Sequence, residues 1–397
     1  MESIDKLETQ PLNLHNDHNV YILGAGFSAP AGLPVIANFT NRMRDAFFWL
    51  RERGRTTEAG AVEAVLEFRS SASRATERIP LDLENIEHIF SLASASADVS
   101  LIRKATLAIA ATLDYARTVN ADEKSITLLV EQETLRRVPK DWPAPQLGSQ
   151  RIAGLKPGSY VNIPLYDFYA LALSGGPGQL SPSRKDTIIT FNYDTLIDNG
   201  LSHIKVPFSY GFKEGTVKFD SSAICPQYPP DNAIQILKPH GSINWAVSGN
   251  DDRLTVFGDY SDVLARQLSP ELVPPTWSKT FTQALSNVWS EMVRALATAT
   301  RIIVLGYSIP ETDQHFKYLL AAGLQRNVSL RIISFVNLDG EGVRTRVKNL
   351  FRTEELGSRL EPITPRNIEF FFKQYMESPK DQIQRINRAL SLPYEGF

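Results

Sequence analysis

Residues 20–28 read VYILGAGFS, an apolar run of four residues followed at once by a glycine-rich turn. Such a run, bounded by a turn, is typical of a strand that is buried on both faces. Glycines after the strand would let the backbone approach a phosphate group closely. The usual G-x-G-x-x-G spacing is broken by Ala29, so a tight turn without a ligand is an equally good interpretation.

Similar runs recur at 187–191, 234–237, 302–305 and 330–336, each followed by glycine or a polar residue. Amphipathic helix patterns lie between several of these runs. Strands that alternate with helices predict an α/β fold with a Rossmann-like parallel sheet, covered by helices on both faces.

The spacing of apolar residues also predicts how the chain is divided. Residues 36–180 read mostly as helices, including segments around 99–118 and 122–137. The last forty residues predict a strand at Ile368–Phe372 and a terminal helix. These patterns predict three parts: a polar tail over 1–18, a Rossmann-like domain over 19–355 with a helical insertion at about 36–180, and a carboxy-terminal extension over 356–397.

Composition narrows the class of protein. The 397 residues include one cysteine, Cys225, which excludes a disulfide framework and any cysteine-based zinc cage. The six histidines show no metal-ligand spacing, so no metal site is predicted. A net charge of −2 with dispersed basic residues makes direct nucleic-acid binding unlikely. With neither a signal peptide nor a membrane-spanning run, we expect a cytoplasmic protein.

Polar or glycine-containing segments follow the predicted strands. In an open parallel sheet, ligands bind at the carboxyl ends of the strands. His240 is the candidate general base, because an imidazole titrates near neutral pH, and Asn192 could hydrogen-bond a ribose or orient a water molecule. The candidate ligand-contacting residues are Gly24, Ala25, Gly26, Ser28, Asn192, Asp194, His240, Gly306, Ser308 and Asn337.

Each of these positions also has a purely structural interpretation. Asp194 could cap a helix that runs to Gly200, and Thr312 or Asp313 could cap the helix after Ser308. A single histidine is more often structural than catalytic. Asn337, with Asp339 close by, could bind an adenosine ribose or simply form a turn.

Taken in order, the segments resemble the sirtuin family. The family pattern runs GAG-x-S…G-[IL]-P, T-Q-N-x-D, His-Gly, G-[TY]-S and a strand that ends in Asn. This sequence supplies Gly24–Pro34, Thr190–Asp194, His240-Gly241, Gly306–Ser308 and Asn337. The resemblance spans about 19–340 and implies a sirtuin-like fold with NAD+ as the substrate.

The departures from the family pattern point away from deacylation. Sirtuin deacylases carry a four-cysteine zinc module between the His-Gly and G-x-S segments, whereas residues 242–305 here contain no cysteine. Phe191 replaces the glutamine of the second motif, and Val35-Ile36-Ala37-Asn38 stands where deacylases have a Phe-Arg pair. The long helical insertion is also foreign to deacylases. With these features, the chain resembles the sirtuin-like proteins of bacterial antiphage defence. This resemblance implies a sirtuin-like domain that binds no zinc.

The resemblance implies an NAD+ hydrolase (NADase) that cleaves NAD+ to nicotinamide and ADP-ribose and depletes NAD+ in an abortive infection response. Asn192 and His240 would be catalytic, and the other candidate residues would bind the dinucleotide. A homo-oligomer and a HerA-type hexameric ATPase partner are expected, with activity controlled by assembly. The alternatives are an NAD-dependent protein deacylase and a non-catalytic sensor of NAD+ or ADP-ribose.

Overall fold

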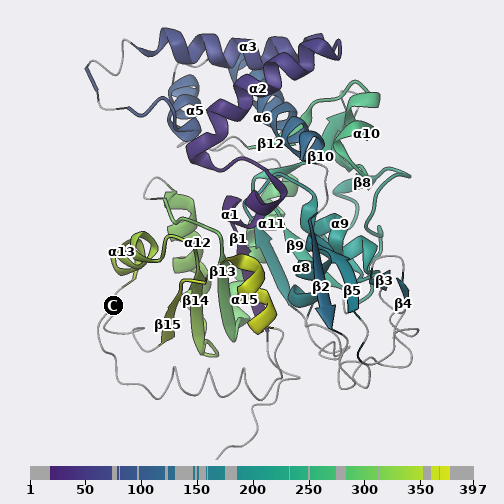
Figure 1. The fold of residues 1–397 in the computed structure, drawn as a ribbon, viewed down its shortest axis with the longest axis vertical. Helices are drawn as coiled ribbons and strands as arrows, with labels where there is room; N and C mark the ends of the chain where they lie inside the picture. Colours follow the sequence, from purple (N-terminus) through teal and green to yellow (C-terminus); the bar gives the residue numbers. More distant parts are fainter. Residues whose placement is uncertain are drawn as a thin grey trace, which may run out of the picture.

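The computed structural model describes residues 18–73, 78–79, 81–95, 98–120, 124–129, 146–147, 150–151, 158, 160–174, 186–231, 233–248, 251–273, 283–310, 313–351, 359–365 and 367–375. The predicted tail over 1–17 and the end of the chain from 376 lie outside these residues. Figure 1 shows a sheet domain below and a group of helices above it.

A seven-stranded parallel sheet forms the lower part of the molecule. Its strand order is β15-β14-β13-β1-β6-β9-β7, and every neighbouring pair runs parallel. The predicted α/β fold with a parallel sheet is confirmed. The strands are β1 (Asn19–Leu23), β6 (Thr187–Thr190), β7 (Phe208–Ser209), β9 (Ile234–Leu237), β13 (Arg301–Leu305), β14 (Ile332–Val336) and β15 (Leu360–Ile363).

Both faces of this sheet are covered, as the uninterrupted apolar strands require. Tyr21 and Leu23 of β1 pack into one core, with α8 (Leu165–Leu173), α9 (Leu196–His203) and α15 (Ile368–Tyr375). Val20 and Ile22 face the opposite core, beneath α11 (Gln283–Thr298), α12 (Gln314–Leu324) and α13 (Gly340–Leu350). Alternate residues of one strand therefore hold two layers of helices to the sheet.

The helical module is the second part of the molecule. It consists of α2 (Phe39–Glu52), α3 (Thr56–Ser71), α5 (Ile86–Ala95) and α6 (Val99–Val119), which share one apolar core (Figure 1). That core also takes Ile243 and Leu272 from a second sheet, together with Phe257, which directly follows one of its strands. This sheet has the order β12-β10-β11-β8 and comprises β8 (Val217–Phe219), β10 (Gly241–Ser248), β11 (Asp251–Val256) and β12 (Pro270–Leu272), with α10 (Tyr260–Ala265) beside it.

Two sequence predictions are wrong. The helix predicted over 122–137 is replaced by β2 (Ser125–Leu129), which pairs antiparallel with β5 (Tyr160–Pro164); residues 130–137 lie outside the described residues. Polar Ser125 and Thr127 alternate with apolar residues there, which is the period of a strand. The strand predicted at Ile368–Phe372 is the start of α15, because Ile368, Phe371 and Phe372 have helical spacing and are all buried.

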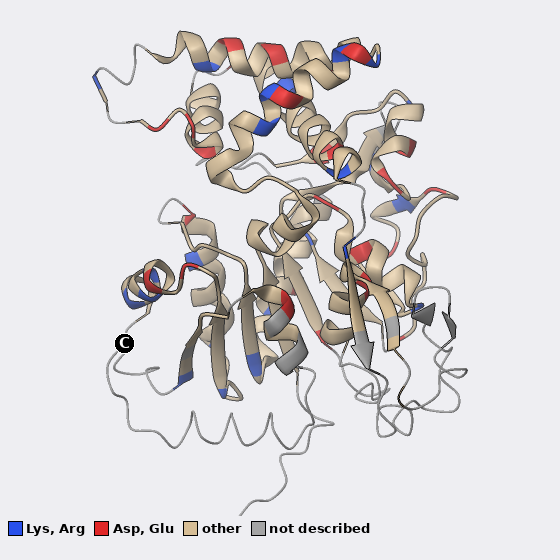
Figure 2. Cartoon of the chain, viewed as in Figure 1, with Lys and Arg blue, Asp and Glu red and all other residues tan. Residues whose placement is uncertain are grey.

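The remaining elements are short. They are α1 (Ala25–Ser28), the 3₁₀ turns η3 (Ala29–Ala31) and η4 (Ile36–Asn38), and the strand pair β3 (Gln146–Leu147) and β4 (Gln150–Arg151). Lys, Arg, Asp and Glu are interspersed over both parts of the molecule (Figure 2). Within the described residues, no helix is long and apolar enough to cross a membrane.

Candidate active site

A cavity of about 1010 Å³ lies where the carboxyl ends of the parallel strands meet the helical module. Its volume is at the upper end of the range for ligand pockets, about 300–1,000 Å³. The loops after β1, β6, β9, β13 and β14 all contribute to its wall. All ten candidate residues from the sequence line this one cavity: Gly24, Ala25, Gly26, Ser28, Asn192, Asp194, His240, Gly306, Ser308 and Asn337.

The glycines after β1 and β13 allow two loops to touch. The Gly24 N–H donates to the Leu305 carbonyl at 3.0 Å, and the Gly26 N–H donates to the Gly306 carbonyl at 2.8 Å. A Cβ on Gly26 would lie 2.7 Å from that carbonyl oxygen. These two amide groups are therefore bonded to the β13 loop and do not face a phosphate, which fits a tight turn, the second of the two interpretations that the sequence left open.

Asn192 connects the first two loops. Its Nδ2 donates to the Gly24 carbonyl and to the Ser28 hydroxyl, both at 2.9 Å. Ser28 in turn donates to Asp194 at 2.7 Å. Because both amide hydrogens of Asn192 are donated within the protein, its carbonyl oxygen Oδ1 is the atom that this side chain can offer to a ligand.

Asp194 lines the cavity and also helps to begin α9. Its Oδ1 accepts from the N–H of Leu196, the first residue of α9, at 3.1 Å, whereas Thr195 takes the cap position, so the prediction of Asp194 as the N-cap is wrong by one residue. Burial raises the pKa of this carboxyl, while nearby Lys238 and the Ser28 hydrogen bond act to lower the pKa. Asp194 thus holds Ser28, and through Ser28 it holds Asn192.

Lys238 is a residue of this region that sequence reasoning missed. Its fully buried ammonium group donates to the Asp194 carbonyl at 2.5 Å and lies 3.4 Å from Asp198. Tyr210 donates to the other oxygen of Asp198 at 2.7 Å. A lysine next to a proline in a loop gives no sequence signal for burial, since lysine is almost never fully buried unless it is paired.

His240 follows β9 and lies among aromatic rings. Its ring centre is 5.2 Å from that of Phe191, which stacks on Tyr307 at the same centre-to-centre distance. The His240 side chain is buried, and its carbonyl accepts from the Val273 N–H. Phe191, the departure from the sirtuin glutamine, therefore helps to form an apolar wall beside the imidazole.

The β13 and β14 loops close the other end of the site. Gly306 has a φ of 62°, which favours glycine, and a Cβ there would lie 2.3 Å from the Phe27 nitrogen. Ser308 is exposed. The Asn337 side chain donates to the Tyr307 carbonyl at 3.2 Å, so it fixes the two loops to each other. Asp313 caps α12 through the Phe316 N–H, as predicted.

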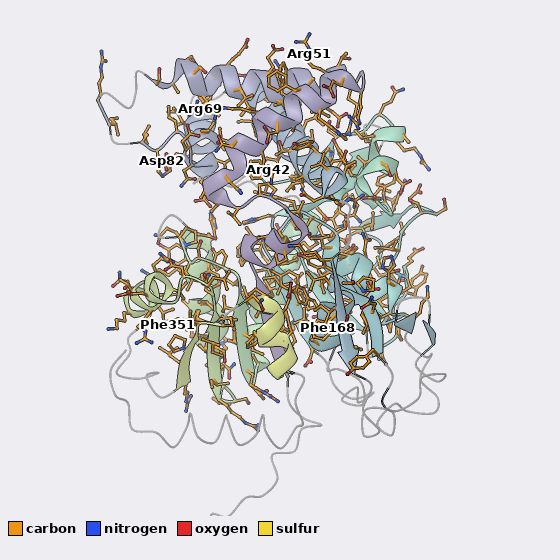
Figure 3. All side chains as sticks on the ribbon, in the orientation of Figure 1. Arg42, Arg51, Arg69, Asp82, Phe168 and Phe351 are labelled. Carbon is orange, nitrogen blue, oxygen red and sulfur yellow. The ribbon has the colours of Figure 1, made fainter. Side chains whose placement is uncertain are left out.

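The helical module supplies one wall of the cavity, which no sequence motif predicted. Its contribution is apolar and acidic, and Asp82, labelled in Figure 3, stands in the loop that leads to α5. Glu87 of α5 also lines the cavity. Burial chiefly raises the pKa of Tyr307, and the charges of Asp313 and, to a smaller extent, Glu87 add to the increase. Residues from this part of the chain that line the cavity include Phe39, Asp82, Glu84, Ile86, Glu87 and Phe90.

Residues 242–305 carry nearly all of β10, then β11 and β12 of the second sheet, followed by α11 and β13. This is the stretch in which sirtuin deacylases carry their four cysteines, and Cys225, outside it, is buried as a free thiol. Among the described residues, no group of three histidine, cysteine or carboxylate side chains is arranged to hold a metal ion.

Part of the chain matches a known protein family. Residues 186–350, from just before β6 to the end of α13, match the family model described as a SIR2-like domain. Six of the ten candidate residues fall within that match, and the four from the β1 loop precede it. No curated protein matches the chain.

Several solved structures are similar along most of the chain. A Sir2 complex with an inhibitor, 2′-O-acetyl-ADP-ribose and a deacetylated p53 peptide shares 12% identity, covering 92% of this chain and 96% of the other, with a TM-score of 0.37. A Sir2–p53 peptide–NAD+ complex shares 12% identity over 96% and 100%, with a TM-score of 0.38. Sir2Tm with a propionylated peptide shares 12% over 95% and 98%, with a TM-score of 0.36.

Proposed function

We propose that this protein is an NAD+ glycohydrolase, which cleaves the bond between nicotinamide and ribose and releases nicotinamide and ADP-ribose. The observation that carries the proposal is the convergence of five strand-end loops on one cavity. The SIR2-like domain match over 186–350 supports a dinucleotide as the ligand. The cavity volume is sufficient for a ligand of that size.

The proposed reaction divides the work among residues of the cavity. The bond breaks through an oxocarbenium-like state at C1′ of the ribose. Asn192 offers Oδ1 to a ribose hydroxyl or to the attacking water, and its donated hydrogen bonds keep that oxygen in place. His240 accepts the proton of that hydroxyl or water; such general-base help is typically worth about 10²–10⁴-fold.

The remaining candidate residues bind the rest of the dinucleotide in this proposal. Ser308 and the loop from Gly24 to Ser28 lie against the pyrophosphate, and Asn337 lies against the adenosine ribose. Because the Gly24 and Gly26 amides are bonded to the β13 loop, that part of the turn contributes its close-packed shape rather than free N–H donors.

The larger biological role is part of the same proposal. NAD+ loss would act in antiphage defence as abortive infection, and assembly into a homo-oligomer or with a HerA-type hexameric ATPase would control the activity. The helical module and the tail over 1–18 are the proposed interfaces. We also propose that 19–355 acts as one catalytic unit, with 356–397 as an extension whose β15 and α15 complete the same sheet and core.

Product analysis tests the reaction directly. The protein, alone and with the proposed HerA-type ATPase, is incubated with NAD+, and the products are separated by chromatography. Nicotinamide and ADP-ribose are the expected products. Saturable NAD+ binding without nicotinamide release would indicate a sensor instead, and O-acetyl-ADP-ribose formed from an acetylated peptide would indicate a deacylase.

Two variants test the assigned roles. His240→Ala and Asn192→Ala should abolish NAD+ loss while far-UV circular dichroism stays unchanged. His203→Ala is the matched control, since His203 lies on α9 with an exposed side chain and does not line the cavity. Undiminished turnover in His240→Ala would remove His240 from the mechanism, and unfolding of Asn192→Ala would favour a structural role for that residue.

A further inference from the structure

The charges that line the cavity are unevenly distributed. Among the described residues of its wall, Arg346 is the one permanent cation, whereas five carboxyl groups line it: Asp82, Glu84, Glu87, Asp194 and Asp313. A dinucleotide carries two negative charges on its pyrophosphate. In so acidic a cavity, an anion binds favourably only beside a compensating cation.

Arg346 is placed for such a contact. It lies on α13, which follows β14, and one face of this helix, made by Gly342, Thr345 and Arg346, lines the cavity. One terminal nitrogen of its guanidinium group donates to Asp339 at 3.0 Å. Its Nε is buried and has no hydrogen-bond partner among the described residues. Because Nε has no accessible surface, the donors that remain for a further acceptor are those of the terminal nitrogens, only one hydrogen of which is given to Asp339.

We propose that Arg346 binds the 5′-diphosphate of the adenine nucleotide in this cavity. The inference rests on the proposed function and adds a binding residue that no motif assigned. Asn337 and Asp339, on the loop before α13, place Arg346 at the adenosine end of the site. A planar guanidinium group with several donors is suited to phosphate oxygens.

Equilibrium binding to the full chain tests the proposal, with ADP, adenosine and 2′-AMP as probes that cannot be hydrolysed at a nicotinamide bond. Arg346→Gln should weaken ADP binding about tenfold or more and change adenosine binding less than about twofold, because one charge-assisted contact is lost. Arg346→Lys should recover part of the ADP affinity. Arg344→Gln, an exposed arginine on the same helix outside the cavity wall, should bind ADP as the wild type does.

Asp339→Asn separates phosphate binding from the ion pair. Asparagine can still cap α13, so this variant frees Arg346 and should keep or increase the ADP affinity. An equal loss in Asp339→Asn and Arg346→Gln, equal ADP binding by Arg346→Gln and wild type, or a loss confined to 2′-AMP would each overturn the assignment. If the protein releases nicotinamide but Arg346→Gln leaves the ADP affinity unchanged, only this inference fails. If neither ADP nor adenosine binds, the proposed function fails too.

Discussion

The buried cation next to the candidate site, Lys238, allows a direct test of which contacts stabilise the site. Lys238 and Asp198 are both fully buried, and the lysine also bonds to the Asp194 carbonyl at 2.5 Å. These contacts join β9, which leads to His240, to the loop that carries Asn192. Replacing Lys238 by methionine keeps most of the side-chain volume and removes the charge.

The expected cost follows from what the substitution leaves behind. Asp198 would keep its hydrogen bond from Tyr210 but would lose its cation in a place without solvent. Breaking one partner of a buried pair costs about 3–5 kcal/mol. The double variant Lys238→Met with Asp198→Asn removes both charges of this pair, and Tyr210 can still donate to the oxygen of the new amide. We therefore expect the double variant to be more stable than Lys238→Met alone.

Urea unfolding provides the assay, followed by tryptophan fluorescence because Trp245 is fully buried beside Tyr210, with ring centres 4.9 Å apart. Lys317→Met, at an exposed position on α12, is the control and should change the free energy of unfolding by less than about 0.5 kcal/mol. If Lys238→Met costs no more than this control, or if the double variant is the least stable of the three, the buried-pair reasoning is refuted.

Three further predictions concern other parts of the molecule. Gly306→Ala should cost about 1–3 kcal/mol in urea unfolding and weaken ligand binding, because a Cβ would meet the Phe27 nitrogen and φ is positive; unchanged stability would contradict this. Burial lowers the pKa of His18, whose ring also bonds the Thr187 hydroxyl. The unfolded chain therefore binds a proton more readily at this residue than the folded chain does, and the free energy of unfolding should fall as the pH drops below about 6.5. His18→Gln should flatten that dependence between pH 7.5 and 5.5. Burial raises the pKa of Cys225 to about 12, so an aromatic disulfide reagent should label it only after unfolding, and rapid labelling of the native protein would argue against its burial.

Much of the fold follows from local pattern. The apolar runs of β1, β6, β9, β13 and β14 are buried on both faces, and such strands form a parallel sheet between two layers of helices. The two wrong secondary-structure predictions, at 122–137 and at Ile368–Phe372, fall where the pattern of apolar residues was short. Ile368, Phe371 and Phe372 fit a helix, yet the cluster of aromatic residues there reads equally well as a strand until the sheet that it covers is known.

The sequence by itself determined which edge of the sheet would carry the candidate site. Parallel strands present their carboxyl ends at one edge, and the residues that follow each strand are read directly from the chain. Tertiary structure alone decided how that edge is completed. The acidic wall around Glu87, the cation of Arg346 and the buried pair of Lys238 with Asp198 all join segments that are distant in the sequence. Pairing and charge compensation across such distances depend on packing in three dimensions, which no local spacing encodes.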